Sequence, residues 1–165
     1  MNPALGVDIG GVLIRPARSE EDTSFFSSDY LETPEVEGGF EALRQLNEII
    51  FEQSVYLVSK ARPTTAQKTR EWLEHHDFYE RTGLSPEHVY FCEKRKDKAP
   101  IAENLGLSAF IDDRPDVLGH LETVENKILF AESEEWLPNG ARRMKFNVCT
   151  GWHSVLECLF IQYSG

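Results

Sequence analysis

Three acidic side chains follow two apolar stretches of the chain. Asp8 lies at the end of the apolar run 5–9, and the pair Asp112 and Asp113 directly follows the run 109–111. Carboxylate oxygens are the ligands that a hard divalent cation such as Mg²⁺ prefers, and such a cation commonly keeps several waters besides. If the two stretches lie side by side, these residues predict a Mg²⁺ site.

A hydroxyl and an amine occupy comparable positions elsewhere in the chain. Ser59 follows the apolar run 55–58, and Lys98 follows Asp97 at the predicted start of a helix. An ammonium group and a helix N-terminus both attract anions, so Lys98 is preferred over the neighbouring Lys94, Arg95 and Lys96 as a phosphate ligand. With the cation offsetting charge, Asp8 could attack a phosphate and form an aspartyl-phosphate.

The elements that must position these residues alternate along the chain. Short apolar runs typical of strands occur at 5–9, 55–58, 89–91, 109–111 and 128–130, and segments of helical period lie between them. Such alternation predicts an α/β fold with a parallel sheet. In an open parallel sheet, ligands bind beyond the carboxyl ends of the strands, which is where the residues named above lie.

Composition and charge limit the classes of function. A chain of 165 residues predicts a single domain spanning residues 1–165, and its net charge of −11 argues against nucleic acid polymers and anionic membranes as partners. No stretch approaches the length of about 20 apolar residues that a membrane span requires. Three scattered cysteines without metal-ligand spacing suggest reduced thiols, so we expect a cytoplasmic protein.

The order of the four motifs resembles that of the haloacid dehalogenase-like (HAD) hydrolases. These motifs are Asp8-Ile9-Gly10-Gly11-Val12-Leu13, Ser59, Lys98, and Asp112-Asp113 after an apolar strand. The resemblance covers roughly residues 5–130. Within the superfamily, the stretches 92–98 and 111–115 look most like the 5′-nucleotidase and deoxyribonucleotidase-type branch.

The resemblance implies a Rossmann-like sheet of five parallel strands in the order 5-4-1-2-3, flanked by helices. It also implies that Asp8 is both nucleophile and Mg²⁺ ligand, that Gly10 offers its carbonyl to the metal, and that Asp112 and Asp113 complete the metal shell. Ser59 and Lys98 would hold the phosphoryl group.

Three further residues complete the expected substrate-binding set. These are Gly11, Lys60 and Arg114, although Arg114 could equally pair with a carboxylate. The expected substrate is a small phosphorylated metabolite, such as a nucleotide. The residues 15–39 read as a flap or minimal cap, since neither gap between motifs has room for a helical cap domain. Neither the substrate nor the oligomeric state can be read from the sequence.

One position departs from the pattern of the family. Its phosphatases usually place a second Asp two residues after the nucleophile, where it protonates the leaving group; this chain has Gly10 there. General acid-base help contributes roughly 10²–10⁴ in rate. Two functions are therefore open: a Mg²⁺-dependent phosphatase that favours good leaving groups, and a catalytically impaired protein that binds Mg²⁺ and phosphate as a sensor or interaction module.

Overall fold

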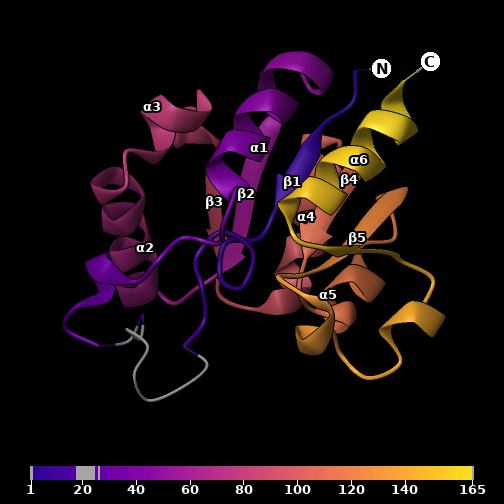
Figure 1. Ribbon diagram of the computed structural model, residues 1–165. Coiled ribbons are helices and arrows are strands. Elements are labelled where there is room, and N and C mark those ends of the chain that lie inside the picture. Colours follow the sequence, from indigo (N-terminus) through magenta and orange to yellow (C-terminus); the bar gives the residue numbers. More distant parts are fainter. Residues whose placement is uncertain (1, 18–24, 26, 165) are drawn as a thin grey trace.

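The fold is described from a computed structural model, which places residues 2–17, 25 and 27–164. Its centre is a parallel sheet in the order β3-β2-β1-β4-β5-β6 (Figure 1). The strands are β1 (Leu5–Val7), β2 (Val55–Lys60), β3 (Val89–Cys92), β4 (Ala109–Asp112), β5 (Asn126–Ala131) and β6 (Asn147–Thr150). The predicted Rossmann-like α/β class and the order of the five expected strands are confirmed.

The expected number of five strands is wrong, because β6 adds a sixth at one edge of the sheet. Among the described strands it pairs with β5 alone, where Phe130 lies opposite Cys149. Only two of its four residues, Val148 and Cys149, are apolar, and Asn147 is exposed. An edge strand needs fewer buried side chains than a central one, so its apolar pattern is weak.

Six α-helices connect the described strands or follow them. They are α1 (Gly39–Gln45), α2 (Pro63–His75), α3 (Phe78–Thr82), α4 (Lys98–Leu105), α5 (Pro115–His120) and α6 (Trp152–Tyr163). A π-helical turn, Leu46–Ile50, extends α1. Proline occupies the first turn of α2 and α5, where its missing N–H costs nothing. No described helix is long and apolar enough to cross a membrane.

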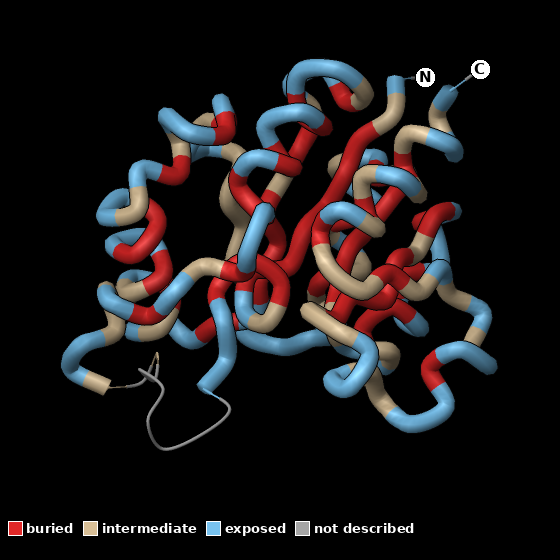
Figure 2. Tube along the Cα trace, in the orientation of Figure 1, coloured by how far each residue is buried: buried red, intermediate tan, exposed pale blue. Residues whose placement is uncertain are grey.

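Two apolar cores cover the two faces of the sheet, because successive strand residues point to opposite sides. On β4, Ile111 packs with residues of α1, α2, α3 and α6, whereas the adjacent Phe110 packs with residues of α4 and α5. Leu129 and Phe130 of β5 divide in the same way. Figure 2 shows the strands as the most continuously buried part of the chain.

The chain after β1 turns tightly and then pairs with a distant segment. The Ile9 carbonyl accepts hydrogen bonds from the backbone N–H groups of Val12 (3.2 Å) and Leu13 (2.8 Å). Ile14 then forms an antiparallel bridge with Glu35. The expected flap, residues 15–39, therefore leaves and rejoins the fold at one place; residues 18–24 and 26 of that segment lie outside the described residues.

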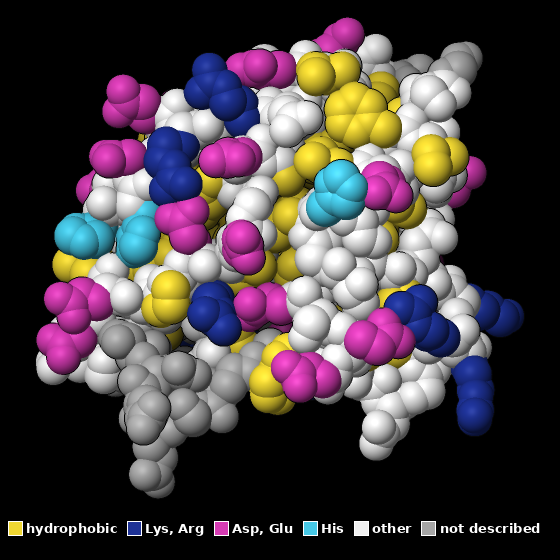
Figure 3. Space-filling view, viewed as in Figure 1, with side chains coloured by type: hydrophobic (Ala, Val, Ile, Leu, Met, Phe, Trp, Pro, Cys, Tyr) yellow, Lys and Arg dark blue, Asp and Glu magenta, His cyan; other side chains and the backbone are white. Residues whose placement is uncertain are grey.

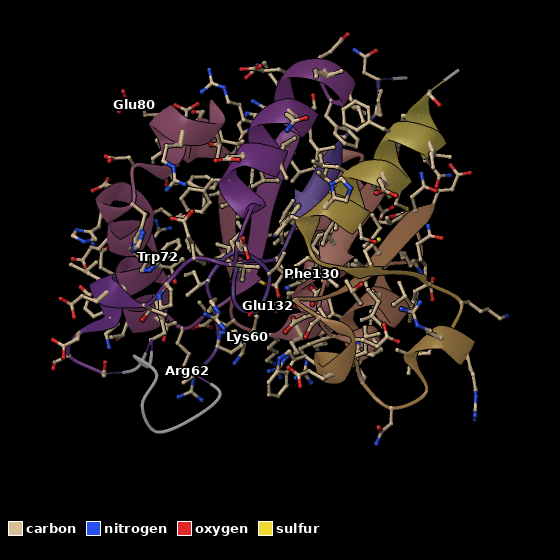
Figure 4. The ribbon with its side chains drawn as sticks, in the orientation of Figure 1. Lys60, Arg62, Trp72, Glu80, Phe130 and Glu132 are labelled. Carbon is tan, nitrogen blue, oxygen red and sulfur yellow. The ribbon has the colours of Figure 1, made fainter. Side chains whose placement is uncertain are left out.

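The described part of this segment is held against α2. The buried indole of Trp72 donates to the Thr33 carbonyl at 2.9 Å, and a ring nitrogen of His76 lies 2.8 Å from the Leu31 carbonyl. Trp72 is labelled in Figure 4. These contacts fix the loop next to the carboxyl ends of β1 and β2, where it can form one wall of a site.

Candidate active site

A buried lysine joins the ends of β1 and β4. Lys98, at the start of α4, donates to Asp8 at 3.0 Å and to Asp112 at 2.9 Å. Lys98 is 2% exposed, Asp112 is fully buried and Asp8 is 7% exposed. Because β1 and β4 are hydrogen-bonded neighbours, residues separated by 104 positions in the chain meet at one sheet edge. The structure thus brings three of the sequence-predicted residues together.

Asp113 completes a cluster of three carboxylates. Oxygen atoms of Asp8, Asp112 and Asp113 all lie within 4.8 Å of one another. An all-oxygen donor set of this size fits a hard divalent cation, which would offset the repulsion between the carboxylates. The chain's own residues therefore fit the metal that the sequence predicts.

The electrostatics of the cluster show an excess of negative charge. Burial, followed by the charge of Asp8, raises the pKa of Asp112 to about 7 although Lys98 lowers it. Burial and the charges of Asp8 and Asp112 raise the pKa of Asp113 to about 8. Burial alone would lower the pKa of Lys98, but Asp8 and Asp112 outweigh it and raise that pKa above the ordinary lysine value. One lysine does not balance three carboxylates, so this site favours an added cation.

Gly10 and Gly11, in the turn after Asp8, differ in whether a larger side chain could replace them. Gly11 has φ +80°, and a Cβ on it would lie 2.2 Å from a carboxylate oxygen of Asp113. Any larger residue at this position would therefore strain the backbone and displace Asp113. Gly10 lacks these constraints, since a Cβ on it would meet no heavy atom within 4 Å.

A cavity of ≈ 280 Å³ opens beside this cluster. Ser59 and Lys60 at the end of β2 line it together with Gly10, Gly11 and Asp113. Five predicted residues therefore border one space that can hold a small molecule. Ser59 is 7% exposed and lies within β2; the N-cap of α2 is Arg62, so Ser59 does not cap that helix.

Arg114 lies apart from the buried cluster. Its guanidinium forms two contacts of 3.1 Å with Asp116, and 47% of its side chain is exposed. Its backbone N–H donates to Asp112 at 3.0 Å, which helps to orient that carboxylate. Of the two possibilities for its side chain, pairing with a carboxylate is the one observed here.

Sequence reasoning missed several walls of the cavity. They are Ile14, Arg15, Pro16, Ala61, Thr65 and Thr69. Thr65 and Thr69 are one turn apart on α2, and this spacing was the available signal. Ala61 directly follows β2, whereas Ile14, Arg15 and Pro16 lie at the pairing of residues 14 and 35, which no local pattern predicts.

A second hollow of ≈ 400 Å³ lies between α1 and α6. Val36, Ala42, Trp152 and Leu156 are among the residues that line it, and none of the predicted site residues borders it. Figure 3 shows this face, where hydrophobic atoms lie between the two helices and acidic side chains surround them. The predicted chemistry thus belongs to the cavity at the strand ends.

Comparison with known proteins supports the fold. No protein-family model matches the chain. An inferred nucleotidase of Oceanobacillus iheyensis is 23% identical over 128 residues, which are 78% of this chain. The chain spans 63% of the length of that relative.

Among solved structures, a similar one is the cobalt-bound deoxy-D-mannose-octulosonate 8-phosphate phosphatase of Haemophilus influenzae. Its TM-score is 0.54 at 14% identity, and the match covers 97% of this chain and 88% of the other. At this identity the match supports the fold of the chain. In its motifs and in its fold, the chain described here resembles the HAD-like hydrolases, and among them the nucleotidase-type branch.

Proposed function

We propose that the protein is a Mg²⁺-dependent phosphatase of the HAD type that acts on a small phosphomonoester, such as a nucleotide. The observation that carries this proposal is the buried contact of Lys98 with Asp8 and Asp112 beside Asp113. Placing two buried carboxylates and a third, half-buried one beside a single lysine is costly unless a cation joins them. Such a cost is typical of a site built for binding and catalysis rather than for stability.

Asp8, Asp112 and Asp113 would hold the metal with the Gly10 carbonyl. Mg²⁺ would supply neutralisation of the charge on the phosphate oxygens. Lys98 keeps one Asp8 oxygen in place through a contact of 3.0 Å. Asp8 is thus held directly before the cavity-lining residues Ile9 and Gly10, where it can act as the nucleophile.

The reaction divides into two displacements at phosphorus. An Asp8 oxygen bonds to phosphorus while the ester oxygen leaves with its bonding electrons and takes a proton from water. Water then attacks the aspartyl-phosphate, which releases inorganic phosphate and restores the Asp8 carboxylate. Ser59 and Lys98, with the backbone of Gly11, would bind the phosphoryl oxygens through both steps.

Because Gly10 offers no acidic side chain, the reactivity of a phosphate ester depends on its leaving group. Without a positioned proton donor, an ester whose leaving oxygen is stable as an anion reacts most readily. The same observation favours the second candidate function, a catalytically impaired protein that binds Mg²⁺ and phosphate as a sensor or interaction module. Both candidates require the same metal site and differ in turnover.

Hydrolysis of an aryl phosphate in the presence of Mg²⁺ distinguishes the two candidates. For a phosphatase, the wild-type protein turns over the ester and Asp8→Asn does not. A wild-type protein that is no faster than Asp8→Asn contradicts the enzymatic proposal. If Gly10→Asp alone gains activity, the impaired binding protein is supported.

We also propose that residues 1–165 form a single domain, that residues 15–39 act as a minimal cap, and that the protein works in the cytoplasm. The pairing of Ile14 with Glu35 and the contact of Phe25 with the cavity support the role of the cap.

A further inference from the structure

Exposed cations gather where β2 and β3 end. The set that we call the basic rim consists of Lys60, Arg62, Lys94, Arg95 and Lys96. All five are exposed, and none forms an ion pair with another residue that the structure describes. Some of the other cations of the chain do have such partners: Arg15, Arg44, Arg81, Arg114 and Arg142.

Strand pairing brings the two loops of the rim together. Lys60 lies opposite Cys92 in the parallel register, and the backbone N–H of Ala61 donates to the Cys92 carbonyl at 2.8 Å. The chain therefore leaves both strands side by side, with Arg62 two residues beyond Lys60 and Lys94 two beyond Cys92. Figure 4 shows Lys60 and Arg62 at this edge of the sheet.

The rim continues into the proposed active site. Lys60 lines the same cavity of ≈ 280 Å³ as Asp113 and Gly10, so one bound molecule can contact Lys60 and the proposed metal site together. Ile14, Pro16 and Phe25 contribute apolar side chains to the lining of the same cavity. The lining of the cavity thus includes a carboxylate of the proposed metal site, apolar side chains, and the Lys60 ammonium, which has no ion-pair partner among the described residues.

The charge of the whole molecule makes this placement informative. A net charge of −11 repels anionic ligands at long range, and the reacting phosphate already has Lys98 and the proposed metal. Lys98 and the proposed metal can serve that phosphate, and no carboxylate among the residues that the structure describes forms an ion pair with the rim. The rim is therefore available to a separate anionic group.

We propose that the substrate carries a second anionic group, in addition to the phosphate that reacts, and that Lys60 and Arg62 bind it at the mouth of the cavity. This inference rests on the proposed function and narrows its substrate to small molecules with two anionic ends, whether the second end is a carboxylate or a phosphate. Lys94, Arg95 and Lys96 strengthen the positive field there.

Binding of two matched phosphonates tests the inference without requiring turnover. The probes are 4-carboxybenzylphosphonate and 4-carbamoylbenzylphosphonate, which have nearly the same shape and differ by one charge. Their dissociation constants are measured by calorimetry with Mg²⁺ on the wild-type protein, on Lys60→Gln and on Arg62→Gln. Lys145→Gln is the control, because it removes an exposed cation just before β6, at the opposite edge of the sheet.

We expect the wild-type protein to prefer the carboxylated probe by about tenfold, as for two partly exposed charge contacts. Each rim variant should reduce this preference to about threefold, whereas Lys145→Gln should keep it. Equal affinity for both probes, or equal effects of Lys60→Gln and Lys145→Gln, would overturn the inference. Tighter competition by a single-stranded oligonucleotide than by the carboxylated probe would overturn it in favour of a polymeric ligand.

The failure of this inference differs from a failure of the proposed function. If the aryl phosphate is hydrolysed through Asp8 but the two phosphonates bind alike, the phosphatase stands and the second anionic group does not. If the carboxylated probe is preferred but Asp8→Asn hydrolyses the aryl phosphate as fast as the wild type, binding of a second anionic group by the rim is supported and the proposed reaction through Asp8 is rejected.

Discussion

Restoring an acid at Gly10 is expected to accelerate hydrolysis. A Cβ at this position meets no heavy atom within 4 Å, so the side chain of Gly10→Asp fits without displacing a neighbour. Gly10 also lines the cavity that Asp113 and Ser59 border, which places the new carboxyl group next to the bound ester. The nearby carboxylates should raise the pKa of the new group and keep it protonated, as a general acid must be.

The expected gain depends on the leaving group. General acid catalysis contributes roughly 10²–10⁴ in rate, or about 3–5 kcal/mol of the barrier. An alkyl phosphate, whose leaving oxygen needs the proton, should gain nearly all of this factor. An aryl phosphate should gain much less, because its leaving oxygen is already stable as an anion.

The assay compares kcat for the two esters with Mg²⁺ on the wild-type protein, Gly10→Asp and Gly10→Asn. Gly10→Asn is the matched control, since its side chain has the same size but cannot transfer a proton in this way. Thermal unfolding with and without Mg²⁺ checks that each variant folds and still binds the cation. If a folded, Mg²⁺-binding Gly10→Asp protein hydrolyses the alkyl ester no faster than Gly10→Asn, the assigned role of this position is refuted.

Three further predictions concern the stability of the metal-free protein. Lys98→Gln leaves the buried carboxylates of Asp8 and Asp112 without their cation, so it should lower the free energy of unfolding measured in urea by about 3 kcal/mol. An unchanged midpoint of urea unfolding would contradict a stabilising role for these two contacts. Gly11→Ala should destabilise more than Gly106→Ala, because both have positive φ but only Gly11 would meet Asp113. The pKa of Asp113 in the folded state, about 8, exceeds the usual 3.8, so the folded state binds more protons between pH 3.8 and 8 and the stability falls as pH rises through this range. Asp113→Asn should flatten this fall, as measured by thermal unfolding at a series of pH values. An unchanged slope would contradict the prediction.

Much of the site could be predicted because its residues follow strands. The apolar runs before Asp8, Ser59 and Asp112 are buried strands, and parallel strands bring their carboxyl ends to one edge. Lys98 could be chosen among its basic neighbours because it begins α4, and it is the buried one. Periodicity and position were sufficient for these residues.

Other features depend on contacts that no local pattern encodes. The sixth strand has too few apolar residues to stand out, and it exists because β5 offers it an edge. The cavity wall at Ile14 depends on pairing with Glu35, and the pairing of Arg114 with Asp116 competes with a role in binding. The raised pKa values of Asp112 and Asp113 need burial and proximity together, which only the folded chain provides.

The central claim is that Asp8 becomes phosphorylated during turnover. The direct measurement is to mix the protein and Mg²⁺ with a ³²P-labelled phosphomonoester, quench in acid within the first turnovers, and locate the label by peptide mapping. The mechanism predicts an alkali-labile label on the peptide that contains Asp8, and none in Asp8→Asn. Label on another residue, or hydrolysis by Asp8→Asn at the wild-type rate, would contradict it.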